Sequence, residues 1–111
     1  MNGSTARALL LSKRALSGYF LSKTWDQKKA ALHNAYIKSY VAQAECGEDF
    51  DRRTRIMEIT TEMARATGAL HGERISKKQE KIAATFLRSA EVKILEELDS
   101  APMLHKLGLS I

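Results

Sequence analysis

Proline occurs only once in the 111 residues, at Pro102, and this scarcity is the feature that most constrains the fold. Because proline kinks or ends a helix, the residues before it can run in long, uninterrupted helices. The apolar–polar alternation that is typical of strands is absent from the sequence. The sequence therefore predicts an all-α fold.

Apolar residues recur at the spacing of a helix face in four segments. The expected helices cover residues 5–22, 25–45, 51–69 and 77–99, to within a residue or two at each end. Short connections between helices of this length are typical of an up-and-down bundle. We therefore expect a single helical domain over residues 1–111, a compact bundle of about four helices with short loops, with oligomerisation as one way to complete its core.

Capping residues stand where the expected helices begin. Ser4 and Asp49 are placed to accept a backbone N–H at the first and third starts. The segments Thr24–Gln27 and Ser76–Gln79 have the capping-box form, in which two side chains satisfy backbone donors reciprocally. Gly47 is a suitable stop for the second helix, because glycine adopts the left-handed conformation that often ends helices.

Large apolar residues on the four stripes make up the expected core. These are Leu9, Leu16, Phe20, Tyr36, Ile37, Val41, Ile56, Ile59, Met63, Ile82, Phe86, Ile94 and Leu98. The fourth helix has a second apolar flank, and the C-terminal tail 103–111 is also apolar, which is more than one small bundle needs. We interpret this surplus as candidate oligomer contacts, at Leu87, Leu95, Leu104, Leu107 and Leu109.

The formal net charge of +5 is unevenly distributed along the chain. Residues 1–44 contain seven bases and one acid, a net charge of +6, whereas residues 45–111 contain eleven bases and twelve acids. Such a basic region can attract a polyanion or a membrane surface, and it can also be an ordinary solvated face. The candidate polyanion-binding residues are Arg7, Arg14, Lys28, Lys29, Arg52, Arg53, Arg55, Arg74, Lys77, Lys78 and Lys81.

The segment 61–81 loosely resembles a helix-turn-helix motif. Ala64 and Gly68 have the separation found in the second helix and glycine turn, and the bases of residues 74–81 would lie on a recognition helix. This interpretation requires the third helix to split near Thr60, against its unbroken apolar stripe. A plain helical hairpin is the alternative for the same residues.

Residue patterns of catalysis and metal binding are absent from the sequence. The three histidines, at positions 33, 71 and 105, belong to no Glu-x-x-His or His-Glu-x-x-His pattern. A single cysteine, Cys46, excludes an intramolecular disulfide and a cysteine-based zinc site. The carboxylates Glu58 and Glu62 stand beside Arg55 and Arg65, which favours ordinary surface ion pairs. We expect no enzymatic activity, no metal and no cofactor.

The function expected from these patterns is that of a non-enzymatic interaction protein. It would act as an adaptor, regulator or assembly subunit through apolar helix faces and the basic N-terminal half, with another protein or a second copy as partner. A nucleic-acid-binding protein is the alternative. The single cysteine favours a reducing compartment and hence an intracellular, cytoplasmic location. Residues 1–23, with four bases and no acid, leave mitochondrial targeting as a second location. No apolar run is long enough to span a membrane.

Overall fold

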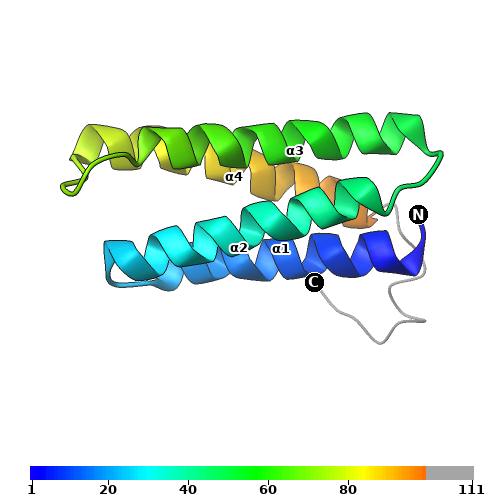
Figure 1. The fold of residues 1–111 in the computed structure, drawn as a ribbon, viewed down its shortest axis with the longest axis horizontal. Coiled ribbons are helices and arrows are strands. Elements are labelled where there is room, and N and C mark those ends of the chain that lie inside the picture. Colours follow the sequence, from blue (N-terminus) through cyan, green and yellow to red (C-terminus); the bar gives the residue numbers. More distant parts are fainter. Residues whose placement is uncertain (100–111) are drawn as a thin grey trace.

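A computed structural model describes residues 1–99 and confirms the all-α bundle (Figure 1). Consecutive helices run antiparallel, so the first two form one hairpin and the last two form another (Figure 1). The second helix packs against the first and the third, and the fourth packs against the third and the first. The helices are α1 (Gly3–Leu21), α2 (Trp25–Ala44), α3 (Phe50–Ala69) and α4 (Lys77–Asp99).

The first helix begins two residues earlier than its sequence indicates, and the prediction that Ser4 caps it is wrong. Asn2 is the capping residue, and its side-chain oxygen accepts a hydrogen bond from the backbone N–H of Thr5 at 2.8 Å. Ser4 lies inside the first turn, where its own backbone is already helical. Asparagine is among the best N-cap residues, which explains the earlier start.

The predicted starts of the other three helices are confirmed. Thr24 accepts from the backbone N–H of Gln27, and Asp49 accepts from the backbone N–H of Arg52. The capping box over residues 76–79 is complete, with bonds of 3.1 Å and 2.9 Å in the two directions. Gly47 has a φ of +61°, the left-handed conformation expected at the end of α2.

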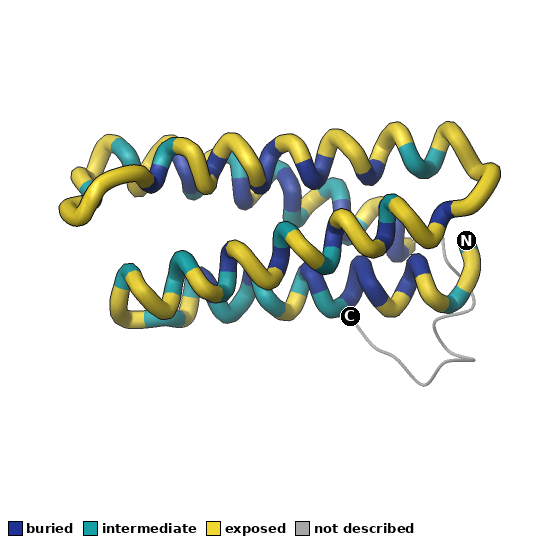
Figure 2. Tube along the Cα trace, in the orientation of Figure 1, coloured by how far each residue is buried: buried dark blue, intermediate teal, exposed yellow. Residues whose placement is uncertain are grey.

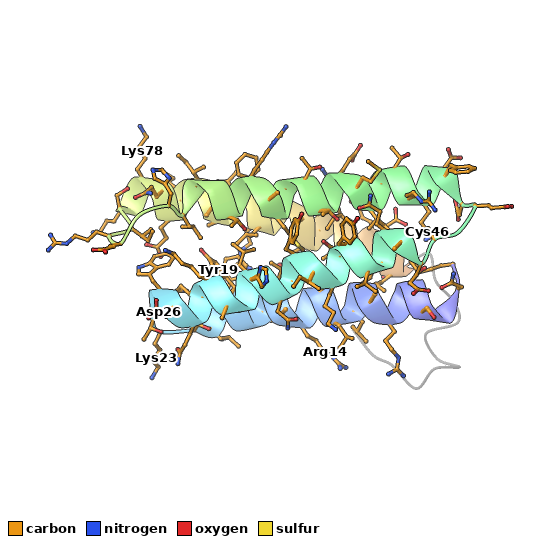
Figure 3. All side chains as sticks on the ribbon, viewed as in Figure 1. Arg14, Tyr19, Lys23, Asp26, Cys46 and Lys78 are labelled. Carbon is orange, nitrogen blue, oxygen red and sulfur yellow. The ribbon has the colours of Figure 1, made fainter. Side chains whose placement is uncertain are left out.

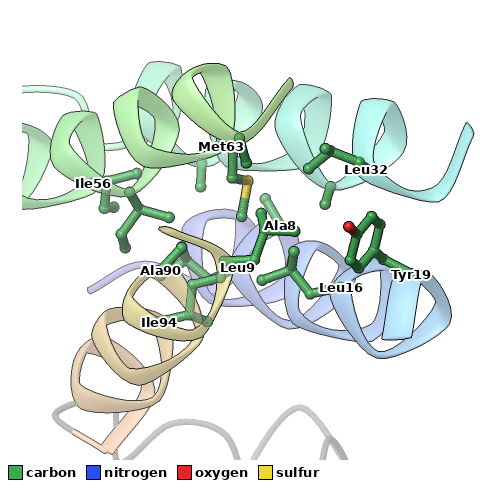
Figure 4. Close-up of a cluster of buried hydrophobic side chains, with 14 of the residues drawn as sticks. Ala8, Leu9, Leu16, Tyr19, Leu32, Ile56, Met63, Ala90 and Ile94 are labelled. Atoms are coloured by element: carbon green, nitrogen blue, oxygen red, sulfur yellow. The ribbon is translucent and has the colours of Figure 1, made fainter. Parts of the chain in front are cut away.

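The centre of the bundle is built as predicted on α1, α3 and the second half of α4. Buried residues line the inner side of each helix, and exposed residues line the outer side (Figure 2). Figure 4 shows Leu9, Leu16, Met63 and Ile94 in one cluster together with Leu32 of α2. Residues of the expected core that are fully buried are Leu9, Leu16, Ile56, Ile59, Met63, Ile94 and Leu98.

The second helix turns its small residues to the core. Its buried positions are Leu32, Ala35, Ser39 and Ala42, so the prediction that Ile37 and Val41 belong to the core is wrong. Small side chains allow α2 to approach its neighbours closely, and hydroxyl groups bridge the short gaps. The Ser12 Oγ of α1 donates to the carbonyl oxygen of Ala35 at 2.8 Å, and the Thr60 hydroxyl of α3 donates to the Ser39 hydroxyl at 3.0 Å.

The buried face of the first half of α4 is shifted relative to the predicted stripe. Ile82 is exposed, so its assignment to the core is wrong, and Ala83 and Leu87 are fully buried in its place. Because α4 contacts both α3 and α1, its buried face is wider than a single stripe. The predicted aromatic core residues lie at the edges of the core and are partly buried: Phe20, Tyr36 and Phe86.

The third helix continues without a break from Phe50 through Thr60 to Ala69. The split that a helix-turn-helix motif would require is therefore not present, and α3 and α4 form a plain antiparallel hairpin (Figure 1). Gly68 lies inside α3, while Gly72, with a φ of +88°, lies in the turn. Among the helices of residues 1–99, none has the length and apolar character needed to cross a bilayer.

Candidate interaction surface

The outward face of α2 has a stripe of four apolar residues and one histidine, which we call the outer stripe. Its members follow one another at intervals of three or four residues and are all exposed. Its largest apolar side chains, Ile37 and Val41, have 42% and 39% of their surface exposed, and the neighbouring Tyr40 has 58% exposed. The outer stripe consists of Ala30, His33, Ile37, Val41 and Ala44.

A groove between α2 and α3, the α2–α3 groove, runs beside the outer stripe. It is made of three adjoining hollows with volumes of about 240, 170 and 200 Å³. The first and second share Tyr40 and Gln43, and the second and third share Tyr36 and Ala64. None of the residues that line these hollows is acidic. They are His33, Tyr36, Tyr40, Gln43, Ala44, Arg53, Met57, Thr60, Thr61, Ala64 and Thr67.

Arg53 closes one end of the groove and is held there by its neighbours. Its guanidinium donates a short hydrogen bond to the carbonyl oxygen of Gly47 and lies 5.5 Å from the centre of the Phe50 ring. The rest of the lining is made of aromatic rings, hydroxyl groups and small apolar side chains. The groove can therefore accept apolar groups along its length and one negative charge near Arg53.

Charge is separated along the long axis of the bundle. We call the end that contains residues 22–29 and 68–81 the basic end, because it has seven bases and three acids. The opposite end, which contains residues 1–8, 45–55 and 96–99, is the acidic end, with seven acids and four bases. Figure 1 shows the two hairpin turns together at one end and the α2–α3 turn with the start of α1 at the other.

The predicted polyanion-binding residues do not gather on one face. Figure 3 shows Arg14 on the α1 side of the bundle and Lys78 on the opposite side, beyond α3. Arg7 lies near the start of α1, at the acidic end, far along the bundle from Lys77 and Lys78 (Figure 1). This arrangement favours partners other than one extended polyanion, because its phosphates would meet only part of the basic set.

Two of the predicted basic residues donate hydrogen bonds to backbone carbonyl oxygens near the basic end. Lys28 Nζ donates to the carbonyl oxygen of Tyr19 at 3.0 Å and lies 4.8 Å from the centre of that ring. Lys29 Nζ donates to the carbonyl oxygen of Gly72 at 3.2 Å, which joins the tips of the two hairpins. The exposed bases that remain at this end are Lys23, Arg74, Lys77, Lys78 and Lys81.

Arg52 and Arg55, at the start of α3, pair with the buried carboxylate of Glu97 on α4. The Arg52 Nη1 lies 2.9 Å from a Glu97 oxygen, and Arg55 makes a short hydrogen bond to the other oxygen. This bond to Glu97 raises the pKa of the Arg55 guanidinium. These arginines therefore join α3 to α4, and a polyanion would have to compete with Glu97 for them.

The carboxylates of α3 also pair across the bundle, instead of with the arginines next to them in sequence. Lys93 of α4 makes a short hydrogen bond to Glu62 and lies 3.8 Å from Glu58. The hydrogen bond that Lys93 donates to Glu62 raises the pKa of the Lys93 ammonium group. Arg65 lies over the ring of Phe86, at 5.9 Å from its centre. Lys93 therefore joins α4 to both carboxylates of α3.

The predicted oligomer contacts are distributed differently from the outer stripe. Leu87 is fully buried in the bundle, where it fills the core and is not available to a partner. Leu95 is partly buried on α4. Three of the predicted contacts, Leu104, Leu107 and Leu109, lie outside the described residues, as does the tail 103–111.

The two histidines of the described residues and the cysteine lie in different parts of the bundle. His33 lines the α2–α3 groove, while the Nδ1 of His71 lies 3.1 Å from the carbonyl oxygen of Gly68, near the α3–α4 turn. Cys46 is buried, and this burial raises the pKa of its thiol. Within residues 1–99, no group of three His, Cys, Asp or Glu side chains is placed to hold a metal ion.

The outer stripe and the α2–α3 groove thus form one adjoining surface that combines exposed apolar side chains with a groove free of acidic residues. Sequence reasoning named Ile37 and Val41 but assigned them to the core. Comparison with known proteins gives no match: no family model, curated protein or solved structure matches this chain. The role of this surface is therefore inferred from its geometry and chemistry.

Proposed function

We propose that this chain is a non-enzymatic interaction protein that binds another polypeptide through the outer stripe and the α2–α3 groove. One observation carries the proposal: α2 turns small residues to the core and keeps Ile37, Tyr40 and Val41 in solvent. Single exposed apolar residues are ordinary on protein surfaces. A contiguous stripe beside a groove is instead typical of an interaction site.

The chemistry of the surface supports a protein partner. Tyr36 and Tyr40 each offer a rigid ring and a hydroxyl group, a combination enriched where protein interfaces bind most strongly. Ala64 and the threonines that line the groove have small side chains, which leave space for a side chain or a ridge of side chains from a partner helix. The stripe extends over 15 residues, about four helical turns, which suits a helix laid along it.

Site-specific photocrosslinking tests this proposal. A photoreactive phenylalanine analogue is placed at Val41 of the outer stripe. In a control variant it is placed at Val92, an exposed valine on α4 that belongs neither to the outer stripe nor to the α2–α3 groove. In a lysate of cells that express the protein naturally, we expect the Val41 variant to form discrete adducts and the Val92 variant to form none. Tyr40→Glu in the same chain should abolish them. Equal labelling from both positions, or no adduct from Val41, would contradict the proposal.

A nucleic-acid-binding function is the second candidate, and the basic end is the observation that favours it. The exposed Arg74, Lys77, Lys78 and Lys81 lie together around the start of α4. Duplex and single-stranded DNA and RNA would be titrated at several salt concentrations, since counterion release makes such binding fall with salt. Absence of salt-dependent binding at low ionic strength would remove this candidate.

An intracellular, cytoplasmic location fits the proposed function. The lone, buried Cys46 suits a reducing compartment. Leu9, Leu10 and Leu16 of α1 belong to the core, and loss of residues 1–23 as a targeting segment would remove them. A fluorescent fusion at the C-terminus would test the location. Co-localisation with mitochondria would favour the alternative.

A further inference from the structure

The outer stripe is symmetric about its centre. Ile37 is the middle residue, His33 and Val41 lie four residues to either side, and Ala30 and Ala44 lie seven residues to either side. Small residues thus mark both ends, and the large apolar side chain is at the middle. A two-fold symmetric interface uses the same patch on both subunits, so that when one residue contacts a second residue of the other copy, the reverse contact is also made. This spacing is compatible with such an interface.

An antiparallel pairing of α2 helices uses this symmetry. With a two-fold axis near Ile37, the two copies of Ile37 face each other, and each Ala30 is level with Ala44 of the second copy. Alanines at both ends let the helices approach to about the 8–10 Å axial distance of packed helices. The α2–α3 groove then lies directly beside the contact, where it can receive Tyr40 of the second copy.

Charge selects the antiparallel orientation. In an antiparallel pair the basic end of each bundle lies beside the acidic end of the other. Formal side-chain charges are +4 at the basic end and −3 at the acidic end, so this arrangement is attractive. A parallel pair would place the two basic ends together and would be repulsive.

We propose that the surface binds a second copy of this chain, so that the protein is an antiparallel homodimer with α2 packed on α2 around Ile37. This inference rests on the proposed function, because it names the partner for the same surface. It differs from the oligomer contacts predicted from the sequence, since Leu87 lies inside the monomer core.

Light scattering after gel filtration, over a range of concentrations, tests the assembly. We expect a mass twice the 12.4 kDa of the chain at high concentration. Ile37→Glu places two carboxylates against each other at the axis and should weaken the dimer about a hundredfold or more. Val92→Glu places a carboxylate at an exposed position of α4, outside the proposed contact, and should leave the dimer intact. Circular dichroism of both variants verifies that the helices are retained.

Thiol crosslinking tests the position of the axis. Ile37→Cys should form a covalent dimer with a short bismaleimide, because both thiols lie at the axis. Val92→Cys should not, and the wild-type chain, whose Cys46 is buried, is the control for the native thiol. Dimers that persist in Ile37→Glu, or that crosslink equally through Val92→Cys, would place the contact elsewhere and overturn the inference.

A monomer at every concentration would overturn the inference as well. The photocrosslinking experiment then decides the proposed function separately. Adducts from Val41 to a different protein would preserve the interaction surface and replace its occupant. An adduct of Val41 within its own chain, to residues 103–111, would show that the C-terminal tail covers the stripe, and it would contradict both proposals.

Discussion

The orientation of α2 can be tested with two substitutions that remove the same number of side-chain carbons. Leu32→Ala alters the face that packs against the core, and Ile37→Ala alters the outer stripe. The two residues lie five positions apart on one helix, and isoleucine has only a slightly lower helix propensity than leucine. The pair therefore isolates the effect of burial on the free energy of unfolding.

Burial predicts very different costs for the two changes. Leu32 is 1% exposed, and replacing a fully buried leucine with alanine costs about 2–5 kcal/mol, because a cavity remains. Ile37 is 42% exposed, so water fills the space it leaves. At about 0.8 kcal/mol per buried methylene, partly offset by the better helix propensity of alanine, Ile37→Ala should cost about 1 kcal/mol.

Urea unfolding followed by far-UV circular dichroism measures both costs. In dilute protein, where no dimer is populated, we expect Leu32→Ala to lower the midpoint by about 1 M or more, and Ile37→Ala by much less. At higher concentration the cost of Ile37→Ala should rise, because the wild-type dimer gains stability by mass action. Equal costs in dilute protein would refute the reasoning, since α2 would then turn Ile37 inward.

Three further predictions concern polar and reactive groups. Glu97→Gln should cost about 1.5–3 kcal/mol in urea unfolding, because it weakens bonds to two arginines, whereas exposed Glu96→Gln should cost little. The backbone hydrogen bond from Arg52 lowers the pKa of Asp49. Stability from this group is complete above the unfolded pKa of about 3.9 and is lost as pH falls through the lower folded value; Asp49→Asn should flatten that acid limb of a pH titration. Burial raises the pKa of the Cys46 thiol, so iodoacetamide at neutral pH should alkylate it far more slowly in folded than in urea-unfolded protein; equal rates would contradict its burial.

The helices were predictable because each has an apolar period and three of the four have one clear start signal; at the start of α1, Asn2 and Ser4 were both available as caps. The stripe of α3 shows this well, since Ile56, Ile59 and Met63 are all buried as expected. That helix has only one apolar face, so the periodicity leaves a single orientation. On α2 two stripes compete, and the larger side chains suggested the wrong one.

Close packing explains which face of α2 is buried. This helix lies against both α1 and α3, and Ala35, Ser39 and Ala42 let it approach both. A stripe of isoleucine and valine would hold the helices further apart and break the hydroxyl contacts of Ser12 and Thr60. This outcome depends on distances between helices, which residue period alone does not encode.

The ion pairs and the charge difference between the two ends of the bundle could not be predicted from the sequence. Arg52 and Glu97 are 45 positions apart, and only the antiparallel packing of α3 and α4 brings them together. Counting charge along the chain located the excess of bases in residues 1–44. It could not show that the charge separates between the two ends of the bundle, because each end draws residues from distant parts of the chain.

The position of the large apolar side chains on α2 has a consequence for the whole molecule. Apolar surface left in water forgoes stabilisation that its burial would supply, and small bundles have little stability to forgo. The core already excludes Ile37 and Val41, so only a second surface can remove them from water. A complementary surface is apolar at its centre and places opposite charges beside the basic end and the acidic end of this bundle. An inverted copy of the same bundle meets both conditions.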